Sequence, residues 1–266
     1  MPSLRRLALA ALLGWPALPA AAAPPVDLLS HRAAYRLSLA ESDTPGGLTA
    51  VRGALVMEWR ASCEGWLSTQ QLGFVADTAE GQGFAYDVRF SSWESLDDRQ
   101  LRFNVRSFDE NGETEVFRGR ASLDGPDGPG VVTYAEPADV DDVELPGGTM
   151  FPTRHVRTLI QAARDGRSVV THEVFDGSGP EALTRVTAAI GQAHPGDAAG
   201  APGQQLWPVS LAYYGVAAPE ETPQFELSFE LAPDGVLYDV TLDYGEFTLK
   251  ADLQKLERFD SPACAP

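Results

Sequence analysis

Apolar and polar residues alternate along most of the chain, which is the pattern of β-strands that bury one face and expose the other. Between residues 100 and 108, for example, Leu101, Phe103 and Val105 alternate with polar side chains. Turns rich in Gly, Asn and Asp separate these segments, and Asn111-Gly112 is a strong hairpin signal. The alternation predicts about 13 strands, at residues 31–39, 52–60, 65–76, 84–93, 100–108, 114–123, 131–135, 168–175, 183–190, 206–214, 224–231, 236–243 and 247–256.

One segment, residues 145–167, departs from this pattern. Val156, Leu159, Ile160 and Ala163 have the i, i+3, i+4, i+7 spacing that places four apolar side chains on one face of a helix. An isolated helix of about a dozen residues is marginal in water, so this face must pack on the β-structure around it. The segment therefore predicts a helical crosspiece on which the strands before and after it pack.

The expected ends of this helix are also visible in the sequence. Thr149 or Thr153 is predicted to cap its start, and Pro152 suits its first turn. Gly166 lies where a left-handed residue commonly ends a helix. These signals limit the helix to the second half of the segment.

Together these elements predict an all-β fold with one main helix. Strands so numerous and so evenly spaced are typical of antiparallel sheets that curl, because a closed or spiral wall removes exposed edges. We predict a large antiparallel sheet of about 13–14 strands, wrapped into a spiral or barrel-like shell. Residues 192–204, rich in Ala, Gly, Pro and Asp, are predicted to be a loop of this single domain, which spans residues 23–266.

The N-terminus has the features of a cleaved export signal. Arg5-Arg6 forms a basic start, residues 7–18 are apolar, and the alanine-rich end gives a small-x-small cleavage site at Ala22. We therefore predict a signal peptide over residues 1–22. The apolar run is shorter than the about 20 residues of a membrane span, so we expect an exported protein that does not span the membrane.

The composition is strongly acidic. The chain has 38 Asp and Glu residues against 20 Lys and Arg, a formal net charge of −18, and loss of Arg5 and Arg6 with the signal brings it to −20. Such a charge repels nucleic acid and anionic lipid headgroups and favours solubility. We therefore expect no nucleic-acid partner.

Cys63 and Cys264 are the two cysteines of the chain. In an exported protein an even pair indicates one disulfide, and two buried free thiols are the alternative. Neither cysteine belongs to a C-x-x-C motif, so the sequence does not indicate a redox-active role.

The sequence contains no recognisable catalytic motif. There is no G-x-S-x-G, no P-loop and no H-E-x-x-H motif. The four histidines, His31, His155, His172 and His194, lie in four separate segments and give no basis for a metal site. We predict a protein that is not an enzyme and that uses neither a metal nor a cofactor.

Positive charge is concentrated on the predicted helix, which carries Arg154, Arg157, Arg164 and Arg167 and follows an acidic run at 139–144. One interpretation is a solvated helix face with local ion pairs, each worth under about 1 kcal/mol. The other is a docking site for an acidic partner or an anionic ligand. The four arginines are therefore our candidate partner-binding residues.

The strands also carry many large apolar side chains, most of which we expect in the core. They include Trp59, Trp66, Trp93, Trp207, Phe74, Phe90, Phe103, Phe225 and Phe229. A curved sheet of this size can also enclose an apolar cavity, as ligand-binding barrels do. A ligand cavity inside the shell is therefore a further hypothesis.

Several short motifs occur in a fixed order along the chain. They are SHRAAYRLSL at 30–39, VRGALVMEW at 51–59, CEGW at 63–66, SWE at 92–94, LRF at 101–103, LPGGTMFPT at 145–153, DG at 176–177, PDG at 233–235 and the C-terminal Cys264. Each motif is weak alone, but the ordered set, which extends from about Leu28 to the end of the chain, resembles the EipB-type cell-envelope integrity proteins of alphaproteobacteria.

This resemblance implies a periplasmic protein whose antiparallel strands wrap into a spiral, barrel-like shell, with a disulfide that falls on Cys63 and Cys264. It implies a role in keeping the cell envelope intact, with no known catalytic activity. The expected mode of action is binding of another envelope component. By analogy with half-open barrels that hold lipid-like ligands, the alternative is a carrier of a lipid or lipoprotein acyl chain.

Overall fold

The computed structural model describes residues 25–42, 47–81, 83–196, 201–216 and 222–264, so the predicted signal peptide lies outside the described residues. The described chain forms strands and one α-helix, α1 (Pro152–Arg164). The strands before the helix are β1 (His31–Ser42), β2 (Leu48–Ala61), β3 (Gly65–Thr78), β4 (Gly83–Ser95), β5 (Gln100–Asp109), β6 (Gly112–Leu123), β7 (Gly130–Glu136) and β8 (Val143–Leu145). Those after it are β9 (Val169–Phe175), β10 (Leu183–Ile190), β11 (His194–Gly196), β12 (Gln204–Gly215), β13 (Phe225–Leu231), β14 (Leu237–Asp243) and β15 (Phe247–Arg258).

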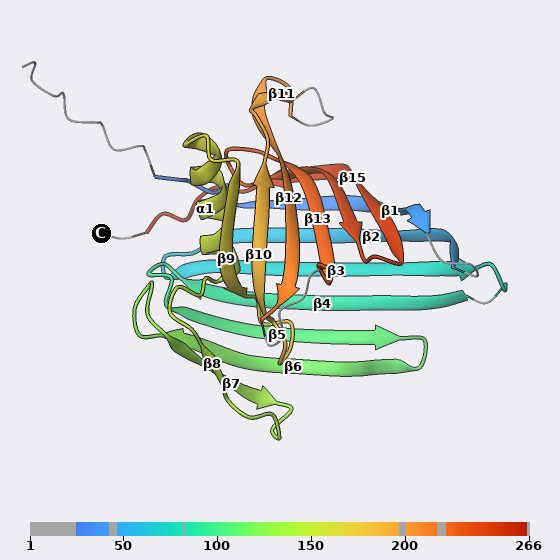
Figure 1. Ribbon diagram of the computed structural model, residues 1–266, viewed down its shortest axis with the longest axis horizontal. Helices are drawn as coiled ribbons and strands as arrows, with labels where there is room; N and C mark the ends of the chain where they lie inside the picture. The colour runs from blue at the N-terminus through green and yellow to red at the C-terminus, as the bar shows by residue number, and fades with distance from the viewer. Residues whose placement is uncertain (1–24, 43–46, 82, 197–200, 217–221, 265–266) are drawn as a thin grey trace, which may run out of the picture.

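The strands form one continuous antiparallel sheet. Its order is β8-β7-β6-β5-β4-β3-β2-β1-β15-β14-β13-β12-β10-β9, and β11 pairs with β12 beside this path. In Figure 1, β1 to β6 run across the molecule, while β9, β10, β12 and β13 stand in front of them at a steep angle. The first and last strands pair in the middle of the sheet. This confirms the predicted fold, an antiparallel sheet wrapped into a barrel-like shell with one main helix.

The two edges of the sheet, β8 and β9, are joined through the segment that leads into helix α1. The backbone N–H of Met150 donates to the carbonyl of Glu173, at 2.8 Å, and that of Phe175 donates to the carbonyl of Met150, at 3.0 Å. Farther along the seam, the hydroxyl of Tyr134 on β7 donates to the carbonyl of Gly179, at 2.6 Å. These contacts nearly close the sheet and leave less of its edges unpaired.

Helix α1 packs on strands from both parts of the sheet. Leu159, Ile160, Ala162 and Ala163 are buried in the main core, which also contains residues of β1–β3, β9, β10 and β12–β15. Val156, the fourth member of the predicted apolar face, is partly buried against the same core. The helix is therefore the predicted crosspiece. No helix in the described ranges has the length and apolarity needed to cross a bilayer.

The start of the helix differs from the prediction. Phe151 is the N-cap residue and its side chain makes no capping hydrogen bond, while Pro152 lies in the first turn as predicted. The hydroxyl of Thr149 donates to the carbonyl of Pro146, at 2.8 Å, and Thr153 already lies inside the helix. Both predicted caps are therefore wrong, because the acceptor for the start of the helix comes from another strand.

That acceptor is the carboxylate of Glu94 on β4. The backbone N–H of Thr153 donates to Glu94 Oε1 and Oε2, at 3.0 and 2.9 Å, and the Thr153 hydroxyl donates to Oε1, at 2.7 Å. A helix start presents unpaired N–H groups and a partial positive charge, which a carboxylate satisfies. Burial nevertheless dominates and raises the pKa of Glu94 to about 7, while hydrogen bonds from Thr153 and the charge of Arg157 lower it.

The strand prediction was incomplete, one large apolar residue lies outside the core, and the predicted end of the helix was confirmed. The three-residue strands β8 and β11 were missed, and β11 lies within the predicted loop 192–204, where it pairs with the start of β12. Trp93 is not a core residue, because it lies opposite exposed Arg102 on the outer face of the sheet. Gly166 ends the helix with a φ of +70°, as predicted.

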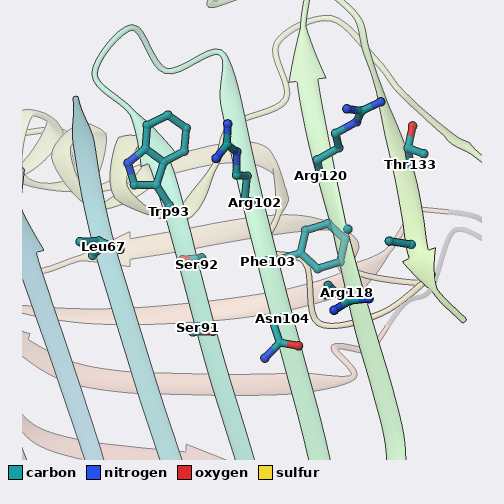
Figure 2. A pocket seen from close by; sticks show the side chains of 12 residues that line it. Leu67, Ser91, Ser92, Trp93, Arg102, Phe103, Asn104, Arg118, Arg120 and Thr133 are labelled. Carbon is teal, nitrogen blue, oxygen red and sulfur yellow. The ribbon is translucent and has the colours of Figure 1, made fainter.

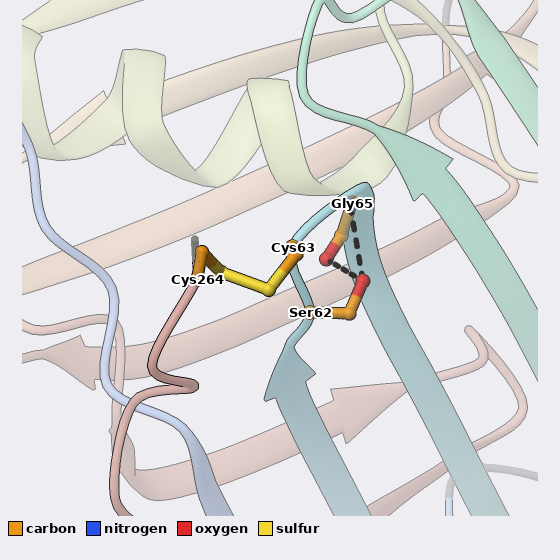
Figure 3. Close-up of a disulfide and its surroundings, with 4 residues drawn as sticks. All are labelled: Ser62, Cys63, Gly65 and Cys264. Carbon is orange, nitrogen blue, oxygen red and sulfur yellow. Dashed lines mark hydrogen bonds between the residues drawn. A yellow bond between two sulfur atoms is a disulfide. The ribbon is translucent and has the colours of Figure 1, made fainter. Parts of the chain in front are cut away.

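Figure 3 shows the disulfide between Cys63, in the turn between β2 and β3, and Cys264 near the C-terminus. Their Cα atoms are 5.4 Å apart. The same turn is stabilised by Ser62, whose hydroxyl donates to the Gly65 carbonyl at 2.7 Å and accepts from the Gly65 N–H at 3.0 Å. The tail beyond β15 is thus attached to the first half of the sheet.

Reduction of this disulfide, or the substitution Cys63→Ser, is expected to lower the melting temperature. The bond spans 201 residues, for which loss of loop entropy in the unfolded chain predicts up to about 5 kcal/mol. We expect a decrease of at least about 5 °C in calorimetry with and without reductant. The double variant Cys63→Ser/Cys264→Ser is the control, since reductant should not change it. Equal melting temperatures for the oxidised and reduced wild type would contradict this prediction.

The substitution Glu94→Gln is expected to remove part of the pH dependence of stability. The folded-state pKa of about 7 lies above the ordinary 4.5, so the contribution of Glu94 is complete below about pH 4.5 and is lost as the pH rises through 7. The free energy of unfolding of the wild type, relative to the variant, should therefore fall by about 3 kcal/mol between these pH values.

Urea titrations of both proteins at several pH values between 4.5 and 8 measure this difference. Buried His155, whose pKa is lowered to about 3, has the opposite effect on stability at low pH, but it is present in both proteins and cancels. A constant difference over the whole range would mean that Glu94 does not change its protonation state in the folded protein.

Candidate functional site

The wrapped sheet encloses an apolar cavity between its inner face and helix α1. The cavity has a volume of about 470 Å³, and its walls come from β2–β5 on one side and from β9, β10 and β12–β14 on the other. Its lining includes Leu72, Val88, Phe90, Leu159, Leu211 and Phe229. Because alternate residues of a strand point to the same face, the periodicity that builds the core also supplies this lining.

A second hollow of about 490 Å³ adjoins the cavity. Both are lined by Leu55, Gln70, Leu72, Val88, Phe90 and Tyr244, so the two hollows together make an apolar space along the inner face of the sheet. This space extends from helix α1 toward the turn that joins β14 and β15.

The outer part of this space has an aromatic rim. We define the rim as Phe74, Phe84, Tyr86, Tyr244 and Phe247, which line the second hollow. Phe84 and Tyr86 lie opposite buried Ala76 and Phe74 and so belong to the inner face, yet they are 38 % and 39 % exposed. Tyr244 is 37 % exposed and stacks on Phe247, with ring centroids 5.0 Å apart. Exposed apolar side chains grouped around a hollow are a mark of ligand-binding grooves.

Burial perturbs the few ionisable groups at the cavity. It lowers the pKa of His155 to about 3, with nearby His172 acting in the same direction, so this imidazole is uncharged at neutral pH. It also raises the pKa of Tyr213 and of Asp176. Asp176, which accepts a hydrogen bond from the Ser178 N–H at 2.8 Å, is the one acidic residue among the described lining residues, and no Lys or Arg is found there. Such a lining favours uncharged, apolar ligands.

The structure does not bring the four histidines together. His155 and His172 approach each other, with ring centroids 6.0 Å apart, but His31 and His194 are held by other contacts elsewhere in the sheet. Within the described part of the chain, no three His, Cys, Asp or Glu residues are grouped as metal ligands.

Three of the four candidate arginines contact different parts of the chain. Arg154 pairs with Asp127 at 2.8 Å, and Arg157 pairs with Asp98 in the turn between β4 and β5. Arg164 donates to the carbonyl of Pro233 at 3.5 Å. Arg154 and Arg157 therefore attach the helix to two separate turns of the sheet, which agrees with local ion pairs, although their partners lie outside the acidic run 139–144.

Sequence reasoning found the apolar side chains of the cavity but not their arrangement. Trp59, Phe90, Phe225 and Phe229 were all expected in the core, and all of them line the cavity. The alternation of apolar and polar residues identifies which side chains point inward. Which of these side chains remain uncovered depends on how the whole sheet curls. Glu94 gave no signal beyond being a polar residue at an inward position.

Comparisons with known proteins extend over nearly the whole chain. Residues 22–260 match the model of the EipB-like family. The chain is 32 % identical over 251 residues to the cell envelope integrity protein EipB of Brucella abortus (strain 2308), a match that covers 91 % of this chain and 88 % of that protein. It is also similar to the crystal structure of a beta-barrel-like protein of domain of unknown function DUF1849 from Brucella abortus, with a TM-score of 0.81 and 30 % identity over 88 % of this chain and 100 % of that one.

Proposed function

This chain belongs to the EipB-like family, and from that membership we propose that it maintains the integrity of the cell envelope from the periplasm. Its relative in Brucella abortus is named for this role. We propose that the protein acts by binding another envelope component and not by catalysis, since the site described above is a mostly apolar space.

The observation that carries the finer proposal is the apolar cavity with its aromatic rim. A space that is long, apolar and open at an aromatic end suits the acyl chain of a lipid or a lipoprotein. The acyl chain would lie along Leu72, Val88 and Phe90, and its polar end would remain at the rim, where Tyr86 and Tyr244 are partly exposed.

The energetics allow such binding. Each methylene group removed from water contributes about 0.8 kcal/mol, so about ten of them contribute about 8 kcal/mol before the entropic losses of association. The binding free energy of a micromolar complex is about −8 kcal/mol. Measurable affinity therefore requires that most of a long acyl chain enters the cavity.

Wild-type protein is expected to retain co-purified lipid in native mass spectrometry and to bind a fluorescent fatty-acyl probe. The substitution Val88→Trp places a large ring in the space shared by both hollows, and we expect it to weaken probe binding at least tenfold, or by about 1.4 kcal/mol. The matched control is Val75→Trp on the neighbouring strand, because Val75 is 48 % exposed and lies on the outer face.

The two variants separate a cavity site from nonspecific adsorption. Equal loss of probe binding in both variants would point to adsorption on the surface. Absence of lipid and of probe binding in the wild type would overturn the proposal of an acyl-chain site.

A second candidate is an envelope protein that binds at helix α1. The observation that favours it is the exposure of Arg164 and Arg167 at the end of the helix, in contrast to Arg154 and Arg157, which are only partly exposed. When the protein is crosslinked in cells and purified, the wild type should carry a defined partner protein, and the variant Arg164→Glu/Arg167→Glu should not. Recovery of the same partner by both proteins would exclude this surface.

A further inference from the structure

The outer face of β4, β5 and β6 carries a concentration of arginines in a protein that is otherwise strongly acidic. These residues are Arg89 on β4, Arg102 and Arg106 on β5, and Arg118 and Arg120 on β6. They occupy the exposed positions of their strands and make up five of the 20 basic residues of the chain. This face is the opposite side of the sheet from the apolar cavity.

Two pairs of these arginines are direct cross-strand neighbours. Arg89 lies opposite Arg106, and Arg102 lies opposite Arg120. Like charges in this arrangement destabilise an antiparallel sheet. The fold therefore retains two unfavourable contacts on one face, and neither contributes to the core.

Carboxylates on the same surface compensate three of the five arginines. The ion pairs are Arg89 with Asp87, Arg106 with Glu113 and Arg118 with Glu136. Among the described residues, no carboxylate lies within 4.0 Å of the guanidinium group of Arg102 or Arg120. The guanidinium of Arg102 instead lies over Trp93, 5.0 Å from the ring centroid. Two adjacent positive charges thus remain uncompensated.

These two arginines are the centre of a row that crosses five strands. Leu67, Trp93, Arg102, Arg120 and Thr133 are successive cross-strand neighbours from β3 to β7. We call this set the arginine row, and Figure 2 shows its labelled side chains along one side of the sheet. A hollow of about 670 Å³ lies over the row, and Leu67 at its end is 47 % exposed.

We propose that the arginine row binds an extended acidic segment of a partner protein. Trp and Arg are the residues that most often dominate the binding energy of protein interfaces, and the guanidinium fork binds carboxylates with two hydrogen bonds. The hollow fits a chain segment better than a flat bilayer. The acidic remainder of the surface also opposes approach to an anionic membrane.

The spacing of the arginines specifies the pattern of the acidic segment. Arg118 and Arg120 are two residues apart on β6, which corresponds to about 6.8 Å along a strand. Alternate side chains of an extended peptide repeat at the same distance. A segment that lies along β6 with acidic residues at every second position can therefore place one carboxylate opposite Arg120 of the arginine row and the next opposite Arg118, where it would compete with Glu136.

The probe for this proposal is a capped eight-residue peptide of alternating Glu and Thr, titrated into ¹⁵N-labelled protein and followed by nuclear magnetic resonance. We expect saturable shifts of the Nε–H signals of Arg102, Arg118 and Arg120. The variant Arg102→Gln/Arg120→Gln should weaken the peptide at least tenfold without lowering the melting temperature, since it removes a like-charge contact. The same peptide with Gln in place of Glu should not bind.

The matched control is Arg36→Gln/Arg52→Gln, which removes the same charge from two exposed arginines paired with Asp252 and Asp77. It should retain the affinity of the wild type. Equal peptide affinity in the two double variants, or tighter binding of the protein to phosphatidylglycerol vesicles than to the peptide, would overturn the proposal. The outcome is independent of the cavity, because the acyl probe and Val88→Trp test a different face of the sheet.

Discussion

The contact between the Glu94 carboxylate and the start of helix α1 connects the wrapped sheet to its one helix, the two features that give this protein its shape. Helix α1 packs inside the wrapped sheet, and the segment that leads into it connects the two edges of the sheet. Its buried face packs on strands from each half of the sheet, while the residues before it bond to edge strand β9. The position of the helix depends on hydrogen bonds from Thr153 to a carboxylate buried to 2 % exposure. This arrangement keeps an ionisable group in the core, and burial disfavours its charged form.

The wrapped sheet gives its two faces different chemistry. The inner face is mostly apolar, with Glu94 among its few buried polar groups, and the aromatic rim is exposed around an open hollow. The outer face carries nearly all of the charge, and there the register of β4–β6 places arginines side by side in spite of their repulsion. The proposed acyl-chain site and the proposed acidic-segment site lie on opposite faces, so occupation of one would not block the other. Glu94 and Trp93, neighbours in sequence, point to opposite faces of the same strand.

Much of this fold could be predicted from the sequence, for physical reasons that also explain the failures. In long strands such as β5, apolar and polar residues alternate with a clear period of two, so the sequence predicted both the strand and its buried residues. The strands β8 and β11 have three residues each, too few for any period to appear. The helix cap was missed because local rules look for a side chain next to the helix, whereas Glu94 is separated from Thr153 by 59 positions. The cavity was a hypothesis only, because the curl that leaves Phe84 and Tyr86 uncovered arises from the whole sheet.

The pairing of β1 with β15 has a consequence for the way the molecule is assembled. His31 lies opposite Arg258, so the central ladder joins the strand that leaves the ribosome first to the one that leaves last. Every other neighbouring pair on either side of it is closer in sequence, and the hairpins can form while synthesis continues. The central ladder therefore cannot form before the final strand is available, and until then the edge of β1 that pairs with β15 lacks its partner.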